Sequence, residues 1–379
     1  MGKILLLTLE YPPSGGVGRM YRELARAMPP ERIVVWAAPS TAEISPDAFY
    51  TDNYTIRRSP LLSSWGWPRW LVTIFRLDAY LEQQGIDQII VGQVLPLGTA
   101  VWLLSLVRPL HYAVFVHGLD VLKPMKSKRK KWLIKKIFHR ANGIFAANKF
   151  VAGLIKELDV PSAKITVIYP SPALSKFPNA ALVKRLGDEF DLAKAPVLLT
   201  ISRLVERKGH DVVLRALEIV WREVPDLRYF IIGDGPMRAR LKILKNTLSR
   251  HEQVKFLGAL DDDETTAWLS LAAIFIMTPR TLPNGDVEGL GIVYLEAGYA
   301  GKPVIGSYSG GVSEAIVDGE TGLLVPENDI KATTAAILKL LHDPALAARM
   351  GAAGRKRALG FSARSGASKI LEFFNHQTR

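Results

Sequence analysis

Two glutamates, Glu288 and Glu296, stand eight positions apart in the stretch DVEGLGIVYLEAG. On one continuous helix, eight residues give a rise of about 12 Å and a rotation of about 800°, so the two carboxylates would not share a face. Gly289 and Gly291 instead favour an entry loop that carries Glu288, followed by a buried helix that carries Glu296. The free backbone amides at the start of such a helix form an anion site.

This arrangement suits a ligand that has hydroxyl groups at both ends and a phosphate in the middle. One polyol would lie near Glu288, the phosphate on the amides, and a second polyol near Glu296. A nucleotide-sugar has this layout. The alternative is a glycine-hinged helix with two solvated glutamates, and the stretch alone is compatible with both interpretations.

Length and composition set the class of protein. The 379 residues suggest two domains, each large enough for its own core. The absence of cysteine excludes disulfides, thiolate catalysis and Cys-ligated zinc, and it fits a reducing compartment. The N-terminal apolar run is too short for a signal peptide and is interpreted as a first buried strand. Residues 88–107 could suggest a transmembrane helix, but their Gln, Pro and Gly residues favour a strand at 89–92 and a core helix at 99–107.

Short apolar runs alternate with amphipathic stretches along the chain, which is typical of parallel sheets covered by helices on both faces. The strand candidates are KILLLTL, RIVVWAA, QIIVGQ, YAVFVHG, GIFAAN and ITVIYP in the first half, and PVLLTIS, RYFIIGDG, VKFLGAL, AIFIMTP, KPVIGSY and TGLLVP in the second. Residues 170–190 are rich in Pro, Ala and Ser, which predicts a linker. The predicted fold class is α/β, with this linker between two α/β domains.

In open α/β sheets, ligands bind beyond the C-terminal ends of the strands, so the loops there are candidates for the site. The loop after the first strand contains Ser14, Gly15, Gly16 and Gly18 and leads into a helix. Such a loop lets the backbone approach a phosphate closely. It is neither a Walker motif nor a complete dinucleotide fingerprint, so alone it does not identify a phosphate site.

A second loop, SRLVERKG at 202–209, places Arg203 and Lys208 just before a helix that starts near Gly209. Two cations beside a helix N-terminus suit a diphosphate, because arginine can bind it as a fork and lysine adds a point charge. The alternative is a solvated basic loop.

Three other strand ends carry polar residues. His117 and Asp120 follow the run YAVFVHG, where the histidine is either structural or functional. Gly233 and Asp234 lie in IIGDGP, where the aspartate either approaches a ligand or shapes the turn, and the turn is favoured. The acidic run DDDE at 261–264 precedes an amphipathic helix, where acids stabilise the N-terminus. We therefore interpret it as a helix cap and predict no protein-bound metal.

Together these motifs resemble the retaining glycosyltransferases of family 4, which have the GT-B fold of two Rossmann-like domains facing across a cleft. The matching segments are the glycine loop at 14–18, HGLD at 117–120, SRLVERKG at 202–209, GDGP at 233–236, EGLGIVYLEA at 288–297 and SGGVSEAIVDGETGLLV at 309–325. The sequence is especially similar to bacterial phosphatidylinositol mannoside mannosyltransferases, which use GDP-mannose and a lipid acceptor.

The resemblance implies a role for each matching position. Arg203 and Lys208 would hold the donor diphosphate and stabilise the leaving group. His117 would contact the sugar near the reacting carbon, Glu288 would bind sugar hydroxyls, and Glu296 would bind the ribose. The other implied donor-binding residues are Gly15, Gly16, Gly233, Asp234, Gly289, Leu290 and Gly291.

The resemblance also implies an organisation and a mechanism. The first Rossmann-like domain, residues 1–170, would bind the acceptor, and the second, residues 171–360, would bind the donor. A C-terminal helix over residues 361–379 would cross back to the first domain. The leaving phosphate would help to deprotonate the acceptor on the same face of the sugar. Catalysis would then depend on orientation and charge stabilisation, with no cofactor or metal required.

A strongly basic segment predicts a membrane contact. The net charge is +13, and nine of the bases fall between Lys123 and Arg140 with no acid among them. On a helical wheel, residues 128–144 place Leu133, Ile134, Ile137, Phe138 and Ala141 on one face and Arg129, Lys135, Lys136, His139 and Arg140 on the other. Trp132 lies within the basic face, where an anionic membrane would cover it. The alternative is an ordinary surface helix.

The stretch SSWGWPRW at 63–70 brings Trp65 and Trp67 close together, either to insert into lipid, to bind an acceptor, or to form a local core. Two other functions compete with sugar transfer: a nucleotide-sugar 2-epimerase on the same fold, and a nucleic-acid-binding protein, for which no recognition motif is present. We predict a hexosyltransferase at the cytoplasmic face of the membrane, with mannose favoured. GDP is favoured over UDP as the nucleotide. No nucleic-acid partner and no particular oligomeric state are predicted.

Overall fold

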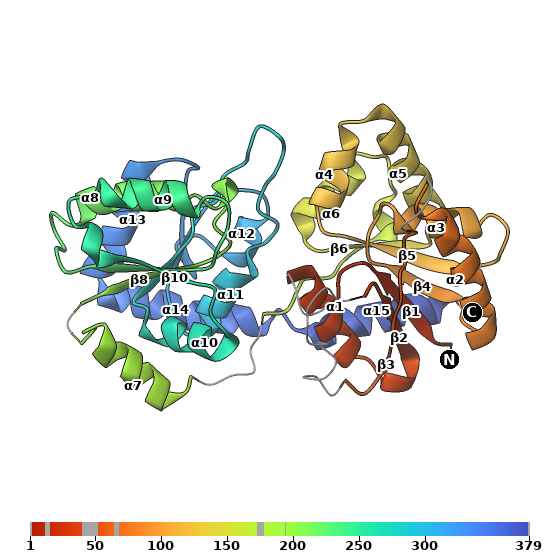
Figure 1. Ribbon diagram of the computed structural model, residues 1–379, viewed down its shortest axis with the longest axis horizontal. Coiled ribbons are helices and arrows are strands. Elements are labelled where there is room, and N and C mark those ends of the chain that lie inside the picture. The colour runs from red at the N-terminus through yellow and green to blue at the C-terminus, as the bar shows by residue number, and fades with distance from the viewer. Residues whose placement is uncertain are drawn as a thin grey trace. The chain divides into compact units, whose positions relative to one another are not determined.

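The computed structural model describes residues 2–11, 16–39, 52–63, 68–172, 178–193 and 195–377. The chain divides into two compact units (Figure 1). The first unit comprises residues 1–171 and 362–379, and the second comprises residues 172–361.

The first unit is built on a seven-stranded sheet in the order β3-β2-β1-β4-β5-β6-β7, and all its strands are parallel. The strands are β1 Ile4–Thr8, β2 Ile33–Ala37, β3 Thr55–Arg58, β4 Gln88–Val91, β5 His111–Val116, β6 Gly143–Ala146 and β7 Ile165–Val167. All six predicted strands are present. The strand β3 was missed because it is a half-exposed edge strand with the sequence TIRR, which lacks a continuous apolar run.

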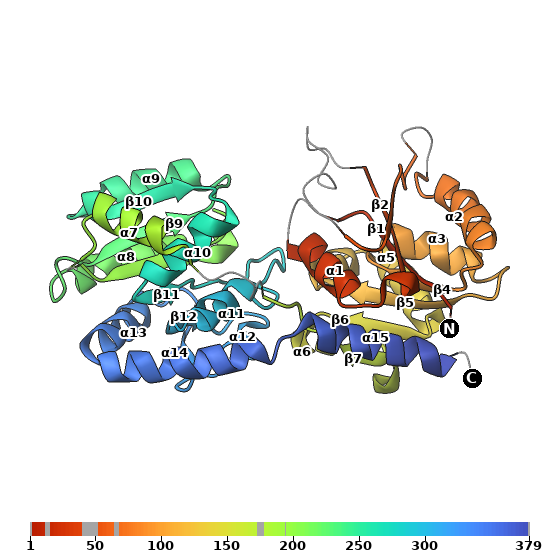
Figure 2. The same cartoon turned by 90° about the horizontal axis from the view of Figure 1, so that it is seen from below.

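Helices cover both faces of this sheet. They are α1 Gly16–Arg26, α2 Leu71–Gln84, α3 Leu97–Leu104, α4 Leu119–Met125, α5 Lys128–Arg140, α6 Lys149–Lys156 and α15 Ala363–Gln377. Side chains of α1 and α15 share one buried cluster with the sheet, and side chains of α2, α3, α5 and α6 share another. The C-terminal helix α15, blue in Figure 2, therefore packs against α1 near the other end of the chain.

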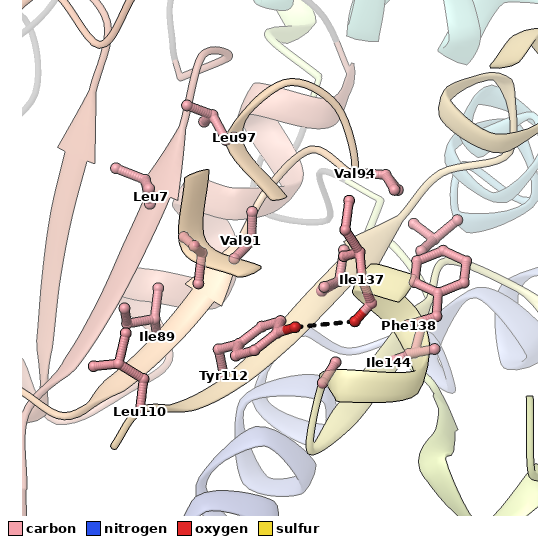
Figure 3. Close-up of a cluster of buried hydrophobic side chains, with 14 of the residues drawn as sticks. Leu7, Ile89, Val91, Val94, Leu97, Leu110, Tyr112, Ile137, Phe138 and Ile144 are labelled. Atoms are coloured by element: carbon pink, nitrogen blue, oxygen red, sulfur yellow. Dashed lines mark hydrogen bonds between the residues drawn. The ribbon is translucent and has the colours of Figure 1, made fainter. Parts of the chain in front are cut away.

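The apolar face of α5 is part of the core. Ile134, Ile137 and Phe138 are fully buried, and Figure 3 shows Ile137 and Phe138 among side chains from β4 and β5. The Tyr112 hydroxyl of β5 donates to the Ile137 carbonyl at 3.0 Å. This packing leaves the opposite, basic face of α5 turned outward.

The second unit has a six-stranded parallel sheet in the order β10-β9-β8-β11-β12-β13. The strands are β8 Val197–Ile201, β9 Arg228–Ile232, β10 Val254–Gly258, β11 Ile274–Ile276, β12 Val304–Ser307 and β13 Gly322–Val325. All six were predicted, and the α/β class with two Rossmann-like halves is confirmed.

The helices of this unit are α7 Ala180–Glu189, α8 His210–Val220, α9 Arg238–Asn246, α10 Asp262–Leu271, α11 Ile292–Tyr299, α12 Val312–Ala315, α13 Ile330–His342 and α14 Pro344–Leu359. Among the described residues, short 3-10 helices lie at Pro30–Arg32, Ser162–Lys164, Glu206–Lys208 and His251–Gln253. Asp261 caps α10 by accepting a hydrogen bond from the Glu264 amide at 2.8 Å, as the sequence indicated.

The prediction of a linker over residues 170–190 was wrong for its second half. The side chain of Asn179 caps α7 by accepting hydrogen bonds from Ala181 and Leu182, and α7 packs against α10. Phe190 then contacts Phe230 and Trp268, with ring centroids 5.3 Å apart in both pairs. A short capped helix with one buried side chain leaves little periodic signal in an Ala-rich sequence.

The apolar stretch at 88–107 forms β4 and α3, close to the predicted strand and core helix. Across the described ranges, none of the helices combines the length and the apolar character that crossing a bilayer requires.

Candidate functional site

Each sheet has one point at which the strand order changes direction. It lies between β1 and β4 in the first unit and between β8 and β11 in the second. Ligands of open α/β sheets bind beyond the C-terminal ends of the strands at such points. Of the described residues singled out in the sequence, His117 lies in the loop after β5, Arg203 and Lys208 in the loop after β8, and Glu288 in the loop after β11.

In the second unit, these loops form an ion cluster of Arg207, Lys208, Asp286 and Glu288. The Lys208 Nζ lies 2.7 Å from the Glu288 Oε2, and the Arg207 guanidinium binds the same oxygen. The Arg207 Nε lies 3.1 Å from the Asp286 Oδ1. Arg207 and Glu288 are buried. The cluster thus directs two cations at one carboxylate oxygen and leaves the other oxygen, Oε1, without a hydrogen bond from any described residue.

The charges of the cluster decide the protonation of Glu288. Burial by itself would raise the pKa of this carboxyl, but the charges and hydrogen bonds of Lys208 and Arg207 outweigh burial and lower the pKa. Burial lowers the pKa of Lys208, and the charge of Glu288 opposes that effect. Glu288 is therefore an ionised acceptor of hydrogen bonds at neutral pH rather than a proton donor.

Arg203 stands apart from the cluster. Its side chain is exposed, and it makes no ion pair with the residues that the structure describes. Its charge nevertheless contributes to lowering the pKa of Lys208, which places it close to the cluster. Arg203 is therefore a third cation near the two carboxylates of the cluster.

Close backbone contacts hold the two loops together. Gly209 has a φ of +71°, and a Cβ atom there would lie 1.8 Å from the Thr278 carbonyl oxygen, so only glycine fits. The Arg280 amide donates to the Arg207 carbonyl at 2.8 Å. The 3-10 turn that carries Arg207 and Lys208 is thereby fixed against the segment that follows β11.

The helix α11 presents the second glutamate. Gly291 begins it in the left-handed conformation, and no side-chain hydrogen bond caps this helix within the part of the chain that the structure describes. Leu290 is buried, while Gly289 and Glu296 are partly exposed. The predicted arrangement of Glu288 in the entry loop and Glu296 on the helix is therefore present.

Asp234 shapes a turn. Its carboxylate accepts a hydrogen bond from the Gly235 amide at 2.7 Å and pairs with Arg238 at 2.5 Å. These contacts lower the pKa of Asp234. The preceding Gly233 has a φ of +127° and comes too close to the Ser202 carbonyl to carry a side chain. Both residues thus shape the turn beside the loop that carries Arg203.

In the first unit, His117 lies at the end of β5. Its Nε2 is 2.6 Å from the hydroxyl of Tyr21, and its ring stacks on Phe115 with centroids 5.0 Å apart. Burial lowers the pKa of His117 to about 4, so the ring is neutral at pH 7.

Asp120 fixes the backbone beside this histidine. Its carboxylate accepts hydrogen bonds from the amides of His117 at 3.1 Å and Gly118 at 2.8 Å. Burial raises the pKa of Asp120 to about 6, although the hydrogen bonds from the amides oppose the shift. Asp120 is therefore a structural partner of the loop that carries His117.

The remaining predictions fall at the edge of the described residues or outside them. Gly16 is the first residue of α1 and is exposed. Gly15, Trp65 and Trp67 lie outside the described residues.

The helix α5 presents its basic face to solvent. Trp132 is 56% exposed and meets the ring of Trp102 on α3 edge-on, with centroids 6.4 Å apart. Arg129 and Lys136 are exposed. Two of the predicted basic residues also make contacts within the protein. Lys135 pairs with Asp159 at 2.6 Å, and Arg140 donates to the Ser105 carbonyl at 2.8 Å.

Sequence reasoning missed Arg207, Asp286 and Tyr21. Arg207 was visible beside Lys208 in SRLVERKG, but adjacent bases do not reveal which of them turns inward. Asp286 lies two residues before Glu288, and its proximity to Arg207 follows only from the fold. Tyr21 looks like an ordinary core residue of an amphipathic helix.

Two family models match the chain. Residues 14–171 match the model described as Glycosyltransferase Family 4, and residues 188–357 match Glycosyl transferases group 1. A GDP-mannose-dependent alpha-(1-6)-phosphatidylinositol monomannoside mannosyltransferase of Mycolicibacterium smegmatis is 31% identical over 361 residues, which cover 94% of each chain. A GDP-mannose-dependent monoacylated alpha-(1-6)-phosphatidylinositol monomannoside mannosyltransferase of Corynebacterium glutamicum is 31% identical, with 93% of this chain and 92% of that one covered.

Solved structures with the same fold include Anabaena Alr3699/HepE in complex with UDP. It superimposes with a TM-score of 0.82 at 18% identity and covers 99% of this chain and 100% of that one. A sucrose-phosphate synthase from Thermosynechococcus elongatus superimposes with a TM-score of 0.78 at 21% identity, with 99% of each chain covered.

Proposed function

Because the chain belongs to the group 1/family 4 glycosyltransferases with the GT-B fold, we propose that it moves a hexose from a nucleotide-sugar to a hydroxyl group of a lipid-linked or glycan acceptor. Mannose and GDP are the favoured sugar and nucleotide, because relatives about 30% identical over nearly the whole chain are described as GDP-mannose-dependent mannosyltransferases. A UDP-sugar is the second choice. The lipid acceptor is proposed on the same ground.

The observation that carries this proposal is the group of three cations, Arg203, Arg207 and Lys208, near the buried carboxylate of Glu288, at the point where the strand order of the second sheet changes direction. Arg203, which forms no ion pair with the described residues, suits the donor diphosphate, because an arginine fork matches phosphate oxygens. Lys208 would exchange its contact with Glu288 for a contact with the diphosphate, while Arg207 would keep Glu288 in place. Both cations would stabilise the negative charge that develops on the leaving nucleotide.

Glu288 suits the sugar. It is ionised, its Oε2 is occupied by cations, and its Oε1 could accept a hydrogen bond from a sugar hydroxyl. With two cations on one oxygen, its carboxylate is a weak nucleophile, which disfavours a covalent intermediate on this residue. We propose a retaining transfer because the sequence resembles the retaining enzymes of family 4. Glu296, one helix further on, would bind the ribose. We propose that Arg203 and Lys208 make a metal ion unnecessary.

A transfer assay tests the proposal. The purified protein is incubated with radiolabelled GDP-mannose or UDP-glucose and phosphatidylinositol-containing vesicles, with and without EDTA. We expect labelled lipid from GDP-mannose, with a rate that EDTA does not change. Loss of transfer on chelation, restored by magnesium or manganese, would overturn metal independence. Label that appears only as free sugar or as an epimerised donor would overturn the transfer itself.

We further propose that the first unit attaches to the cytoplasmic face of a membrane, whose anionic lipids attract bases. Large apolar side chains are exposed on the same layer of helices as the bases of α5. Phe75 on α2 is 71% exposed and Val107 after α3 is 84% exposed. The Arg108–Asp78 ion pair, at 2.7 Å, ties the segment that carries Val107 to α2. Trp132 adds its exposed ring on α5.

The bases and the apolar side chains should contribute in different ways. Each base near an anionic surface is worth about 1 kcal/mol at low salt, and salt screens that attraction. Insertion of Phe75 and Trp132 is not screened. The membrane contact should therefore have one salt-sensitive part and one salt-resistant part.

Co-sedimentation with vesicles that contain phosphatidylglycerol separates these parts. Changing Lys128, Lys130 and Lys136 to Glu should abolish binding at low salt, because these exposed lysines make no ion pair with described residues. The matched control changes Arg240, Lys242 and Lys255 of the second unit to Glu. This control variant should bind more to the vesicles than the variant of Lys128, Lys130 and Lys136. Phe75→Ser with Trp132→Ala should instead weaken the binding that persists at high salt. Sedimentation of the lysine variant like the parent protein would contradict the proposal.

A further inference from the structure

The hydroxyl of Tyr21 lies between two hydrogen-bond partners. It is 2.5 Å from the carbonyl oxygen of Gly92 and 2.6 Å from the Nε2 of His117. Tyr21 belongs to α1, Gly92 follows β4, and His117 follows β5. The two contacts therefore join three elements near the point where the strand order of the first sheet changes direction. Tyr21 is fully buried, and burial raises the pKa of its phenol well above the ordinary value, so it carries its proton.

The number of protons decides the direction of both hydrogen bonds. A carbonyl oxygen can only accept, and a phenol has a single proton to donate. If Tyr21 donated to His117, the oxygens of Tyr21 and Gly92 would face each other at 2.5 Å with no proton between them. Tyr21 therefore donates to Gly92, and the Nε2–H of His117 donates to Tyr21. A neutral imidazole has one N–H, so the other nitrogen, Nδ1, carries a lone pair.

Neighbouring residues hold the His117 ring in this position. Phe115 stacks on it within 9° of parallel, and Asp120 accepts hydrogen bonds from the His117 and Gly118 amides. At Gly92, a Cβ atom would lie 2.8 Å from the Thr8 hydroxyl and 3.1 Å from the Tyr21 ring, so a side chain there would displace Tyr21. The Nδ1 of His117 has no hydrogen-bond partner in the part of the chain that the structure describes.

We infer that Tyr21 is a positioning residue that fixes the Nε2–H tautomer of His117, so that Nδ1 accepts a hydrogen bond from a hydroxyl group of the sugar. The hydroxyl part of this inference rests on the proposed function, whereas the tautomer does not. A lone pair at this place attracts a hydroxyl and repels a phosphate oxygen. The Nδ1 of His117 therefore suits a hydroxyl group rather than a phosphate.

The tautomer can be measured without any substrate. The protein is labelled with 15N-histidine, and the ring signals of His117 are assigned by their loss in the His117→Asn variant. Long-range 1H–15N correlations at pH 7 distinguish the two neutral tautomers. We expect Nε2–H in the parent protein and a shift towards Nδ1–H in Tyr21→Phe. The matched control, Tyr112→Phe, removes a different buried tyrosine hydrogen bond to a carbonyl and should leave the His117 signals unchanged. An Nδ1–H ring in the parent protein would overturn the inference.

Transfer kinetics test the hydroxyl. Tyr21→Phe should lower kcat/KM roughly five- to tenfold, the scale of one lost neutral hydrogen bond. His117→Asn, whose side-chain oxygen can occupy the place of Nδ1, should keep more activity than His117→Gln. Equal losses in these two variants would count against a role for Nδ1.

A panel of donors that each lack one sugar hydroxyl then identifies the partner. With the parent protein, we expect one deoxy donor to react roughly tenfold more slowly than the complete donor. With His117→Ala, removal of the same hydroxyl should slow the reaction much less. If every deoxy donor loses as much rate with His117→Ala as with the parent protein, the assignment of the hydroxyl is overturned. If no donor is transferred at all, the proposed function fails, and the tautomer measurement still decides the role of Tyr21.

Discussion

At the scale of single residues, the site depends on one carboxylate shared by two cations of different character. Arg207 is buried and is held from its other side by Asp286, so it stays with Glu288. Lys208 has a single carboxylate partner and can turn to an incoming anion. A buried ion pair contributes little net stability but strongly constrains geometry, because removing one partner strands the other charge. The cluster is thus suited to hold Glu288 in one orientation.

We predict that Arg203→Ala lowers kcat roughly 10²-fold, the usual scale for losing a group that stabilises charge in the transition state. Folding should survive, because Arg203 is exposed and forms no ion pair with described residues. Arg240→Ala, another exposed arginine of the second unit, is the matched control and should retain full activity. Equal rates in the two folded variants would remove Arg203 from the diphosphate site.

We predict that Glu288→Gln abolishes most transfer but does not weaken binding of GDP. The variant loses the charged acceptor for the sugar and at the same time releases Lys208 for the diphosphate. Glu296→Gln should show the opposite pattern, with weaker binding of GDP, because this residue is assigned to the ribose. Calorimetry with GDP distinguishes the two variants. Loss of GDP binding in a folded Glu288→Gln variant would contradict the assignment.

The residue scale is also where sequence analysis reached its limit. An anion and a polyol could be predicted as ligands from Arg203, Lys208 and Glu288, because the residue type alone determines the charge and hydrogen-bonding capacity of a side chain. The pairing of Arg207 with Asp286 was not visible, since the two residues lie in different loops and meet only when β8 and β11 lie side by side.

At the scale of elements, a buried histidine joins β8 to α8. His210 is the first residue of α8, and its Nε2 lies 3.0 Å from the Ser202 hydroxyl just beyond β8. Burial lowers the pKa of His210 to about 4. This contact helps to position the loop that carries Arg203 and Lys208.

This histidine predicts a dependence of stability on pH. Its stabilising contribution is fully present above about pH 6.5, the ordinary pKa of histidine, and is lost as the pH falls towards 4, because the unfolded chain then binds the extra proton. The loss is on the order of 3 kcal/mol. His210→Gln should be less stable at pH 7 but should lose less stability between pH 6.5 and 4.5. Urea midpoints of parent and variant that fall in parallel would show that His210 is not the titrating group.

The elements themselves were largely predictable. Buried parallel strands are continuous apolar runs, so twelve of the thirteen strands could be located from the sequence. The exceptions have physical causes. The edge strand β3 is half exposed, and the helix α7 depends on its Asn179 cap and on contacts with α10 rather than on a periodic pattern.

At the scale of the whole molecule, the first unit contains segments that lie on both sides of the second unit in the sequence. The helix α15 buries Ala367, Ile370 and Phe374 in the cluster that it shares with α1. The stability of the first unit therefore depends on a helix that follows the second unit in sequence.

We predict that Phe374→Ala lowers the free energy of unfolding of the first unit by about 3–5 kcal/mol, the usual cost of removing a buried phenylalanine side chain. His376→Ala, on the same helix but exposed, is the control and should change little. Hydrogen exchange can follow the two units separately. Faster exchange should appear in α1 and β1 and not in α8 and β8; an equal effect on both units would contradict this division.

The central claim is the transfer of a sugar from a nucleotide donor by the charged loops of the second unit, and its most direct measurement is the structure of the product. The protein is incubated with GDP-mannose and a lipid acceptor, and the product is analysed by NMR of the anomeric proton and carbon. We predict a new α-mannoside, with the anomeric configuration of the donor retained, and no such product from Arg203→Ala in the same time. A β-linked product would contradict retention, and the absence of any glycoside with either GDP- or UDP-sugars would contradict the proposed function.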